Sequence, residues 1–186
     1  MKLLNYGKPL ALLTLTLLSI SQVQAECELI FPASTPSGDF EIHNNGTVTH
    51  KKTKLMWKVC PEGSDWDNGT TCTDGEAGYT WQESLQHVSG LNSSGGFAGY
   101  SDWRLPNIKE LLSIVEDQCH LTAINVDIFN AGALELYHGV FWSSTPSIRN
   151  SGYGLDSAYF IDFRSGSSSS FTRENTAQIR LVRTAE

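Results

Sequence analysis

Four cysteines constrain the fold of this chain more than any other feature, because all of them lie downstream of a segment typical of export signals. They are Cys27, Cys60, Cys72 and Cys119. An even number of cysteines in an exported chain predicts disulfide bonds before it predicts metal binding or redox chemistry. Three pairings are open. We expect Cys60–Cys72, which closes a short loop, together with Cys27–Cys119. The sequence lacks the Cys-x-x-Cys or Cys/His spacing of a zinc site.

Residues 1–25 have the parts of a secretory signal peptide. Lys2 and Lys8 give a positive start, an apolar run covers residues 10–20, and small residues lead to a cleavage site after Ala25. The run is shorter than the roughly 20 apolar residues that span a membrane, so we expect no membrane insertion. Residues 26–186 are then expected to form a single domain that is periplasmic or secreted.

The charge balance argues against two classes of partner. Removing the two leader lysines from the 13 basic residues leaves 11 against 20 acidic ones, a formal net charge of −9. Binding to nucleic acid or to anionic membranes depends on clustered Lys and Arg. We therefore expect no nucleic-acid partner.

Short strands and two helices predict an α+β fold. A capping box, in which the side chains of the first and fourth residues satisfy free backbone amides, occurs at Thr80–Glu83 and again at Asn107–Glu110. Each box is followed by apolar residues at helical spacing. Residues 61–79 are predicted to form a loop that the Cys60–Cys72 bridge would hold. Strands are predicted at 40–43, 47–49, 55–57, 140–142, 158–163, 168–172 and 178–182.

The stretch 101–115, "SDWRLPNIKELLSIV", predicts a joint between a strand and the second helix. Pro106 pushes the preceding residue into an extended conformation, so the helix begins only after it. Arg104 points to the opposite side from Trp103, within reach of the capping region. Its rigid fork of donors suits nearby carbonyls or carboxylates, Asp102 among them. We interpret Trp103, Arg104 and Pro106 as structural. An anion-binding role for Arg104 is the alternative.

Several motifs together resemble one bacterial family. They are "NGTVTHKKTKLMW" (45–57), "YTWQESL" (79–85), "GYSDWRLPNIKELLSIVE" (99–116), "FWSST" (141–145) and "IRLVR" (179–183). In this order they are similar to the Lcl C-terminal domain family, formerly catalogued as a bacterial domain of unknown function. The resemblance covers nearly all of residues 26–186.

The resemblance implies a fold similar to C-type lectins and to the formylglycine-generating-enzyme superfamily. Members of the family are exported and often surface-associated, and the namesake adhesin domain is reported to bind sulfated glycosaminoglycans. This chain has no collagen-like stalk and is strongly acidic, so a polyanion would need a local basic patch. Enzymes of the superfamily use a reactive cysteine pair late in the chain, whereas no cysteine follows Cys119.

Candidate ligand-binding residues fall in the irregular segments. Trp66 lies between two aspartates in the loop 61–79, and Tyr153 lies in a glycine-containing stretch. Exposed aromatic faces stack on sugar rings, although a single aromatic residue can also simply anchor a loop. The one basic cluster of the sequence contains His50, Lys51, Lys52, Lys54 and Lys58, and Lys51, Lys52 and Lys54 form a basic turn within it. It is the best contact for an anionic sugar, and its alternative role is to solvate a hairpin.

Calcium is the one metal that the sequence suggests. Asp65, Asp67 and Asp74 collect hard oxygen ligands, which calcium prefers. The segment does not fit the EF-hand spacing, and a solvated acidic loop is the alternative. We expect no other cofactor.

These observations predict an exported, non-enzymatic binding domain of the adhesin type. Its partner would be a glycan or an envelope or surface protein, contacted through residues 61–79 and 146–156. The alternative is a structural or assembly subunit of a surface appendage or envelope complex, and a homo-oligomer is left open. A hydrolase based on two carboxylates is a third reading. The sequence has no His-Glu-x-x-His motif, no Gly-x-Ser-x-Gly motif and no phosphate-binding glycine loop.

Overall fold

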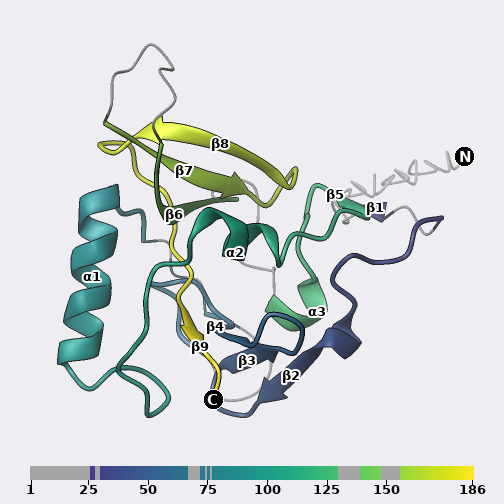
Figure 1. Ribbon diagram of the computed structural model, residues 1–186, viewed down its shortest axis with the longest axis horizontal. Coiled ribbons are helices and arrows are strands. Elements are labelled where there is room, and N and C mark those ends of the chain that lie inside the picture. Colours follow the sequence, from purple (N-terminus) through teal and green to yellow (C-terminus); the bar gives the residue numbers. More distant parts are fainter. Residues whose placement is uncertain are drawn as a thin grey trace, which may run out of the picture.

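A computed structural model describes residues 26–27, 30–66, 72–73, 75, 77–129, 139–147 and 156–186. Antiparallel sheets and short helices make up this part of the chain, which confirms the predicted α+β class (Figure 1). Both expected disulfides, Cys27–Cys119 and Cys60–Cys72, are present.

The first sheet has the strand order β2-β3-β4-β9. Its first three strands form two consecutive hairpins, as the alternating residues and turn signals predict. The turn between β2 and β3 contains Gly46, whose φ of 78° favours glycine. The strands are β2 (Phe40–His43), β3 (Thr47–His50), β4 (Leu55–Lys58) and β9 (Val182–Thr184).

The second sheet has the order β6-β7-β8. The register between β6 and β7 shifts between Trp142 and Pro146, where the backbone amide that a ladder would use is missing in proline. All six residues of β8 pair with β7. The strands are β6 (Val140–Ser147), β7 (Ser157–Asp162) and β8 (Ser167–Thr172).

The helices begin where their caps predict. Thr80 caps α1 (Trp81–Ser93) and Asn107 caps α2 (Ile108–Leu112), each within a complete capping box. The second helix is short, and the chain tightens into a turn after Leu112, which leaves that side chain exposed and buries Ile114 instead. A single turn of helix, α3 (Val126–Phe129), precedes the second sheet.

The predicted strand at 178–182 is wrong in its boundaries. Gln178 exchanges backbone hydrogen bonds with Val140 and Trp142 of the second sheet, whereas β9 begins only at Val182 and pairs with β4. The apolar pattern of this segment therefore marks a crossing between the two sheets.

Two clusters of buried side chains fill the interior. The first cluster includes Trp57, Phe129, Phe141 and Val182. The second cluster includes Met56, Trp103, Trp142 and Leu181. Neighbouring residues of one strand thus belong to different clusters, because successive side chains of a strand point to opposite faces.

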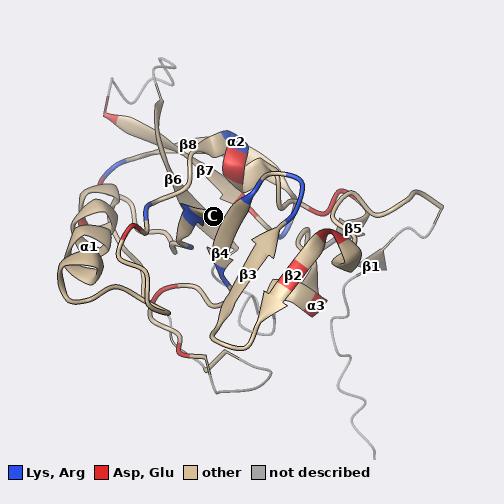
Figure 2. Cartoon of the chain, turned by 60° about the horizontal axis from the view of Figure 1, so that its bottom comes forward, with Lys and Arg blue, Asp and Glu red and all other residues tan. Residues whose placement is uncertain are grey.

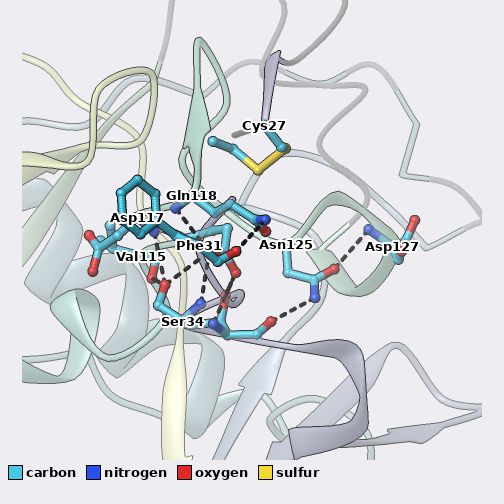
Figure 3. The surroundings of a disulfide bond; sticks show 11 residues. Cys27, Phe31, Ser34, Val115, Asp117, Gln118, Asn125 and Asp127 are labelled. Atoms are coloured by element: carbon cyan, nitrogen blue, oxygen red, sulfur yellow. Dashed lines mark hydrogen bonds between the residues drawn. A yellow bond between two sulfur atoms is a disulfide. The ribbon is translucent and has the colours of Figure 1, made fainter. Parts of the chain in front are cut away.

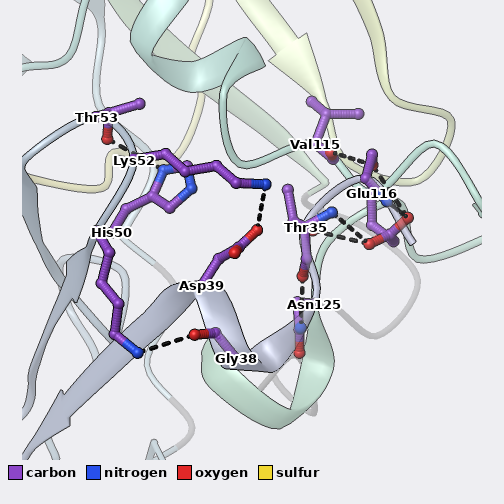
Figure 4. A network of polar contacts seen from close by, with 11 residues as sticks. Thr35, Gly38, Asp39, His50, Lys52, Thr53, Val115, Glu116 and Asn125 are labelled. Atoms are coloured by element: carbon purple, nitrogen blue, oxygen red, sulfur yellow. Dashed lines mark hydrogen bonds and ion pairs between the residues drawn. The ribbon is translucent and has the colours of Figure 1, made fainter. Parts of the chain in front are cut away.

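An N-terminal arm, residues 30–39, lies against the turn that follows α2. Both oxygens of Glu116, a residue only 4% exposed, accept hydrogen bonds from the backbone and hydroxyl groups of Ser34 and Thr35 (Figure 4). The side-chain amide of Gln118 donates to the carbonyl of Phe31 beside the Cys27 disulfide (Figure 3). A short helical turn, η1 (Ser37–Asp39), ends the arm, and β1 (Glu26–Cys27) pairs with β5 (Cys119–His120).

Candidate functional site

A pocket of about 270 Å³ opens beside the turn between β2 and β3. Its walls include the side chains of Trp66, Leu91 and Phe97, and its polar groups include Lys58 and Glu62. The walls come from three segments: the loop after β4, the end of α1 and the glycine-rich loop that follows α1.

The loop that carries Trp66 is fixed at two points. The Cys60–Cys72 disulfide closes it, and the backbone of Trp66 pairs with that of Cys72. Thr73 bonds both the backbone amide and the carbonyl of Asp65. These contacts hold Trp66 half-buried at the pocket wall.

A second part of the wall depends on Phe97. Its carbonyl accepts a hydrogen bond of 3.0 Å from the indole of Trp103, and the two rings meet edge to face at 6.0 Å. A Cβ added at Gly46 would lie 3.1 Å from Phe97 and 3.2 Å from Trp66. Glycine at this position therefore lets the two aromatic side chains approach the same turn.

A buried charge network forms the inner part of the pocket. Lys58 and Glu62 form an ion pair, and their side chains are 9% and 5% exposed. The second oxygen of Glu62 lies 2.6 Å from Nε2 of His87, a residue of α1. The ammonium group of Lys58 also lies 4.2 Å from the centre of the Phe97 ring, a cation–π contact.

Arg180 lies behind this network and is fully buried. Its guanidinium donates to the carbonyls of Lys58 and Val59, whereas its Nε has no hydrogen-bond partner among the described residues. Burial lowers the pKa of Arg180 to about 9, opposed by the charge of Glu62. Arg180 therefore stays charged at neutral pH, and its charge interacts favourably with that of Glu62.

This arrangement is suited to binding. Trp66 and Phe97 supply aromatic surface for the apolar face of a ring, while Lys58 offers a donor and the exposed Asp65 an acceptor in the same pocket. Its volume is close to the lower end of ordinary ligand pockets, about 300 Å³, so it suits one small ring rather than an extended chain.

The basic turn is not part of this pocket. Lys51, Lys52 and Lys54 follow β3 at the end where His50 pairs with Leu55, whereas Lys58 and Gly46 lie at the other end of the same strands. Figure 2 shows the blue turn at the far end of β3 from the turn between β2 and β3.

Two of the three lysines already have partners. Lys51 donates to the carbonyl of Gly38 at 2.8 Å, and Lys52 forms an ion pair of 2.6 Å with Asp39 (Figure 4). Both lysines thus hold the end of the N-terminal arm against the first sheet.

Only one of the three predicted calcium ligands lies among the described residues. Asp65 lies at the pocket, but Asp67 and Asp74 lie outside the described residues, as does Tyr153. Within the described ranges no three His, Cys, Asp or Glu side chains are grouped as a metal site would require. Calcium binding stays a prediction.

The strand–helix joint has the predicted form, and its arginine bonds a carboxylate of the capping region. Arg104 forms two hydrogen bonds of 2.7 Å with Glu110, the capping-box glutamate of α2, rather than with Asp102. Asp102 instead accepts from Arg183 at 2.7 Å. The backbone amide of Ser144 donates a hydrogen bond to the carbonyl of Pro106, which connects the joint to β6.

Sequence reasoning did not single out Phe97, Glu62 and His87 as site residues. The sequence does contain a signal for Phe97, because it is a single aromatic residue in a glycine-rich loop. Trp66 was recognised in the same way, as a single aromatic residue between aspartates. Glu62 and His87 carried none, because their contact joins positions 25 residues apart in the sequence.

The comparisons with known proteins are consistent with this architecture. The described residues contain no helix long and apolar enough to cross a membrane. No curated protein matches the chain. The family model of the Lcl C-terminal domain matches residues 46–183, which include the three-stranded sheet, the residues that line the pocket, and the joint. The chain therefore belongs to the Lcl C-terminal domain family.

Proposed function

We propose that this protein is an exported, non-enzymatic domain that binds a glycan, with one sugar ring held in the pocket that Trp66 and Phe97 line. The observation that carries the proposal is the grouping of two aromatic side chains, Trp66 and Phe97, with Lys58 and Asp65 in one pocket. Sugar rings offer an apolar face for stacking and hydroxyl groups for both a donor and an acceptor.

Export is supported by the two disulfides. Such bonds persist in oxidising compartments and are rare in the cytosol. N-terminal sequencing of the protein recovered from cells should begin at Glu26. A chain that still begins at Met1 would contradict the proposed cleavage.

Two carboxylates, Glu62 and Asp65, line the pocket, which is the feature a carboxylate-based hydrolase would need. A general acid must offer its proton to the substrate. Both oxygens of Glu62 are already occupied by Lys58 and His87. We therefore favour binding over hydrolysis.

A glycan array followed by calorimetry on the best ligand tests the proposal. Trp66→Ala should weaken binding by about tenfold or more, as expected for a central aromatic contact. Trp81→Ala is the matched control, because Trp81 is also partly exposed but stacks on Arg173 away from the pocket. Mass spectrometry should recover the glycan intact.

Three results would contradict the proposal. They are an array without any bound sugar, equal affinity for the Trp66 variant and the unchanged protein, and cleaved glycan after incubation. The last result would favour the hydrolase.

An assembly subunit is the second candidate, and a separate surface favours it. Ile30, Phe31 and Leu121 are 88%, 62% and 55% exposed, and all lie next to the segments that the Cys27–Cys119 disulfide joins. Large exposed apolar side chains of this kind mark contacts with other proteins. Phe31→Ser should then release the protein from a complex that the unchanged protein joins, with glycan binding unaltered.

A further inference from the structure

Strand β8 is an edge strand with a regular backbone. It pairs with β7 over all six residues without a register shift, and the described part of the chain places no strand on its other side. Figure 1 shows β8 on the outer side of β7.

Two other sheet edges, those of β6 and β9, are covered. On β6, the amide of Trp142 donates to the carbonyl of Gln178, and the amide of Ser144 donates to that of Pro106. On β9, Val182 and Arg104 exchange two backbone hydrogen bonds. Covering an edge in this way prevents it from pairing with another chain.

The sequence of β8 has none of the usual protective features. Proteins commonly protect open edges with charged residues, proline or bulges. Residues 165–172, "SGSSSSFT", contain no charged residue and no proline. Ser167, Ser168 and Ser169 are exposed, so their small side chains leave the edge accessible to another backbone.

The free hydrogen-bonding groups of this edge can be assigned from the alternation of the ladder. The amide of Arg173 donates to Asp156 on the inner side, so Ser169 and Phe171 also point their backbone groups toward β7. Ser168 and Ser170 therefore point theirs outward. The outward carbonyl of Thr172 is already used by the amide of Asn175.

From this pattern we infer that two copies of the chain associate by antiparallel pairing of their β8 strands about a two-fold axis at Ser169. Ser168 of one copy then exchanges both backbone hydrogen bonds with Ser170 of the other, and the second such pair follows by symmetry. The two three-stranded sheets become one continuous sheet. This surface is distinct from the pocket, and the inference does not depend on glycan binding.

A second copy fits this edge for two reasons. The free groups at 168 and 170 are symmetric about Ser169, and the occupied carbonyl of Thr172 disfavours a register shifted toward that end. The chain carries a net negative charge, which opposes self-association, but the uncharged segment 165–172 keeps like charges away from the two-fold axis.

The test is sedimentation equilibrium of the disulfide-bonded protein over a concentration series. The unchanged protein should show a monomer–dimer equilibrium. Ser169→Lys should weaken dimerisation by about tenfold or more, because the two lysines would lie directly opposite each other at the axis. Ser169→Glu should do the same.

An equimolar mixture of the Ser169→Lys and Ser169→Glu variants supplies the decisive readout. Opposite charges at the axis should restore a mixed dimer, which a variant that merely fails to fold could not form. Ser167→Lys is the matched control, since it adds the same charge to the same strand away from the axis, and it should dimerise more tightly than Ser169→Lys. A protein that is monomeric up to about 1 mM, or a mixture that stays monomeric, would overturn the inference.

Discussion

Glu116 is the single residue on which the N-terminal arm most depends. It is 4% exposed, and its carboxylate accepts five hydrogen bonds from Ser34, Thr35 and Gln118. Glu116→Gln would place amide hydrogens against some of these donors, and we expect it to lower the free energy of unfolding by about 2–3 kcal/mol. Urea denaturation at pH 7 measures this loss.

The effect of Glu116 should depend on pH in a defined direction. Burial alone would raise the pKa of Glu116, but hydrogen bonds from Ser34, Thr35 and Gln118 more than offset it and hold the pKa below its usual value. Its stabilisation is therefore fully present above the unfolded-state pKa of about 4.3 and is lost as the pH falls through the folded-state pKa. The difference between the unchanged protein and Glu116→Gln should shrink in that range. A difference that stays constant down to pH 2 would assign the loss to packing.

At the scale of single residues, the sequence predicted the structure correctly where the residues that determine it are close together in the chain. Arg104 lies at a joint that Pro106 and the following capping box define within a few positions, and the structure places it there. The sequence could not show that Arg104 bonds Glu110 rather than Asp102. The reason is that Asp102 accepts a hydrogen bond from Arg183, which lies 81 residues further along the chain.

The two disulfides act on different elements and should differ in effect. Cys27–Cys119 spans 92 positions and Cys60–Cys72 spans 12, so by loop entropy their removal costs about 4.6 and about 3 kcal/mol. The double variant Cys60→Ser/Cys72→Ser should nevertheless lose glycan binding, since it frees the loop that holds Trp66. Cys27→Ser/Cys119→Ser should be less stable but bind normally while folded.

Denaturation of both double variants measures the loss of stability, and calorimetry measures the loss of glycan binding. Equal loss of affinity in the two proteins would mean that the pocket does not depend on the Cys60–Cys72 loop.

Elements were predictable from sequence to different degrees. Both helix starts follow from a capping box of four consecutive residues, so no distant contact is needed to place them. The segment 178–184 behaves differently, because its residues bond first to β6 and then to β4. Its strand boundaries depend on partners that lie far away in the sequence.

At the scale of the whole molecule, the pocket is the feature that sequence could least predict. It joins a turn of the first sheet, a disulfide-closed loop and the end of α1. Trp66 could be recognised as a candidate from its polar surroundings, but nothing local in the sequence places it in one pocket with Phe97. The basic turn, which the sequence made equally prominent, lies at the other end of the same strands.

The division of the interior into two clusters predicts how the molecule unfolds. On β4, β6 and β7, and where the chain enters β9, one residue belongs to the first cluster and its neighbour to the second. Neither cluster can lose its packing while the other stays intact, because they share these strands. We therefore expect one cooperative transition, with near- and far-ultraviolet circular dichroism giving the same midpoint.

Leu181→Ala and Val182→Ala delete adjacent, fully buried side chains, one from each cluster. Each substitution should lower the midpoint of that single transition without dividing it into two. Leu181→Ala should lower the free energy of unfolding by about 2–5 kcal/mol. A biphasic transition in either variant would show that the two clusters fold independently, since the deleted side chain would then weaken only its own half of the interior.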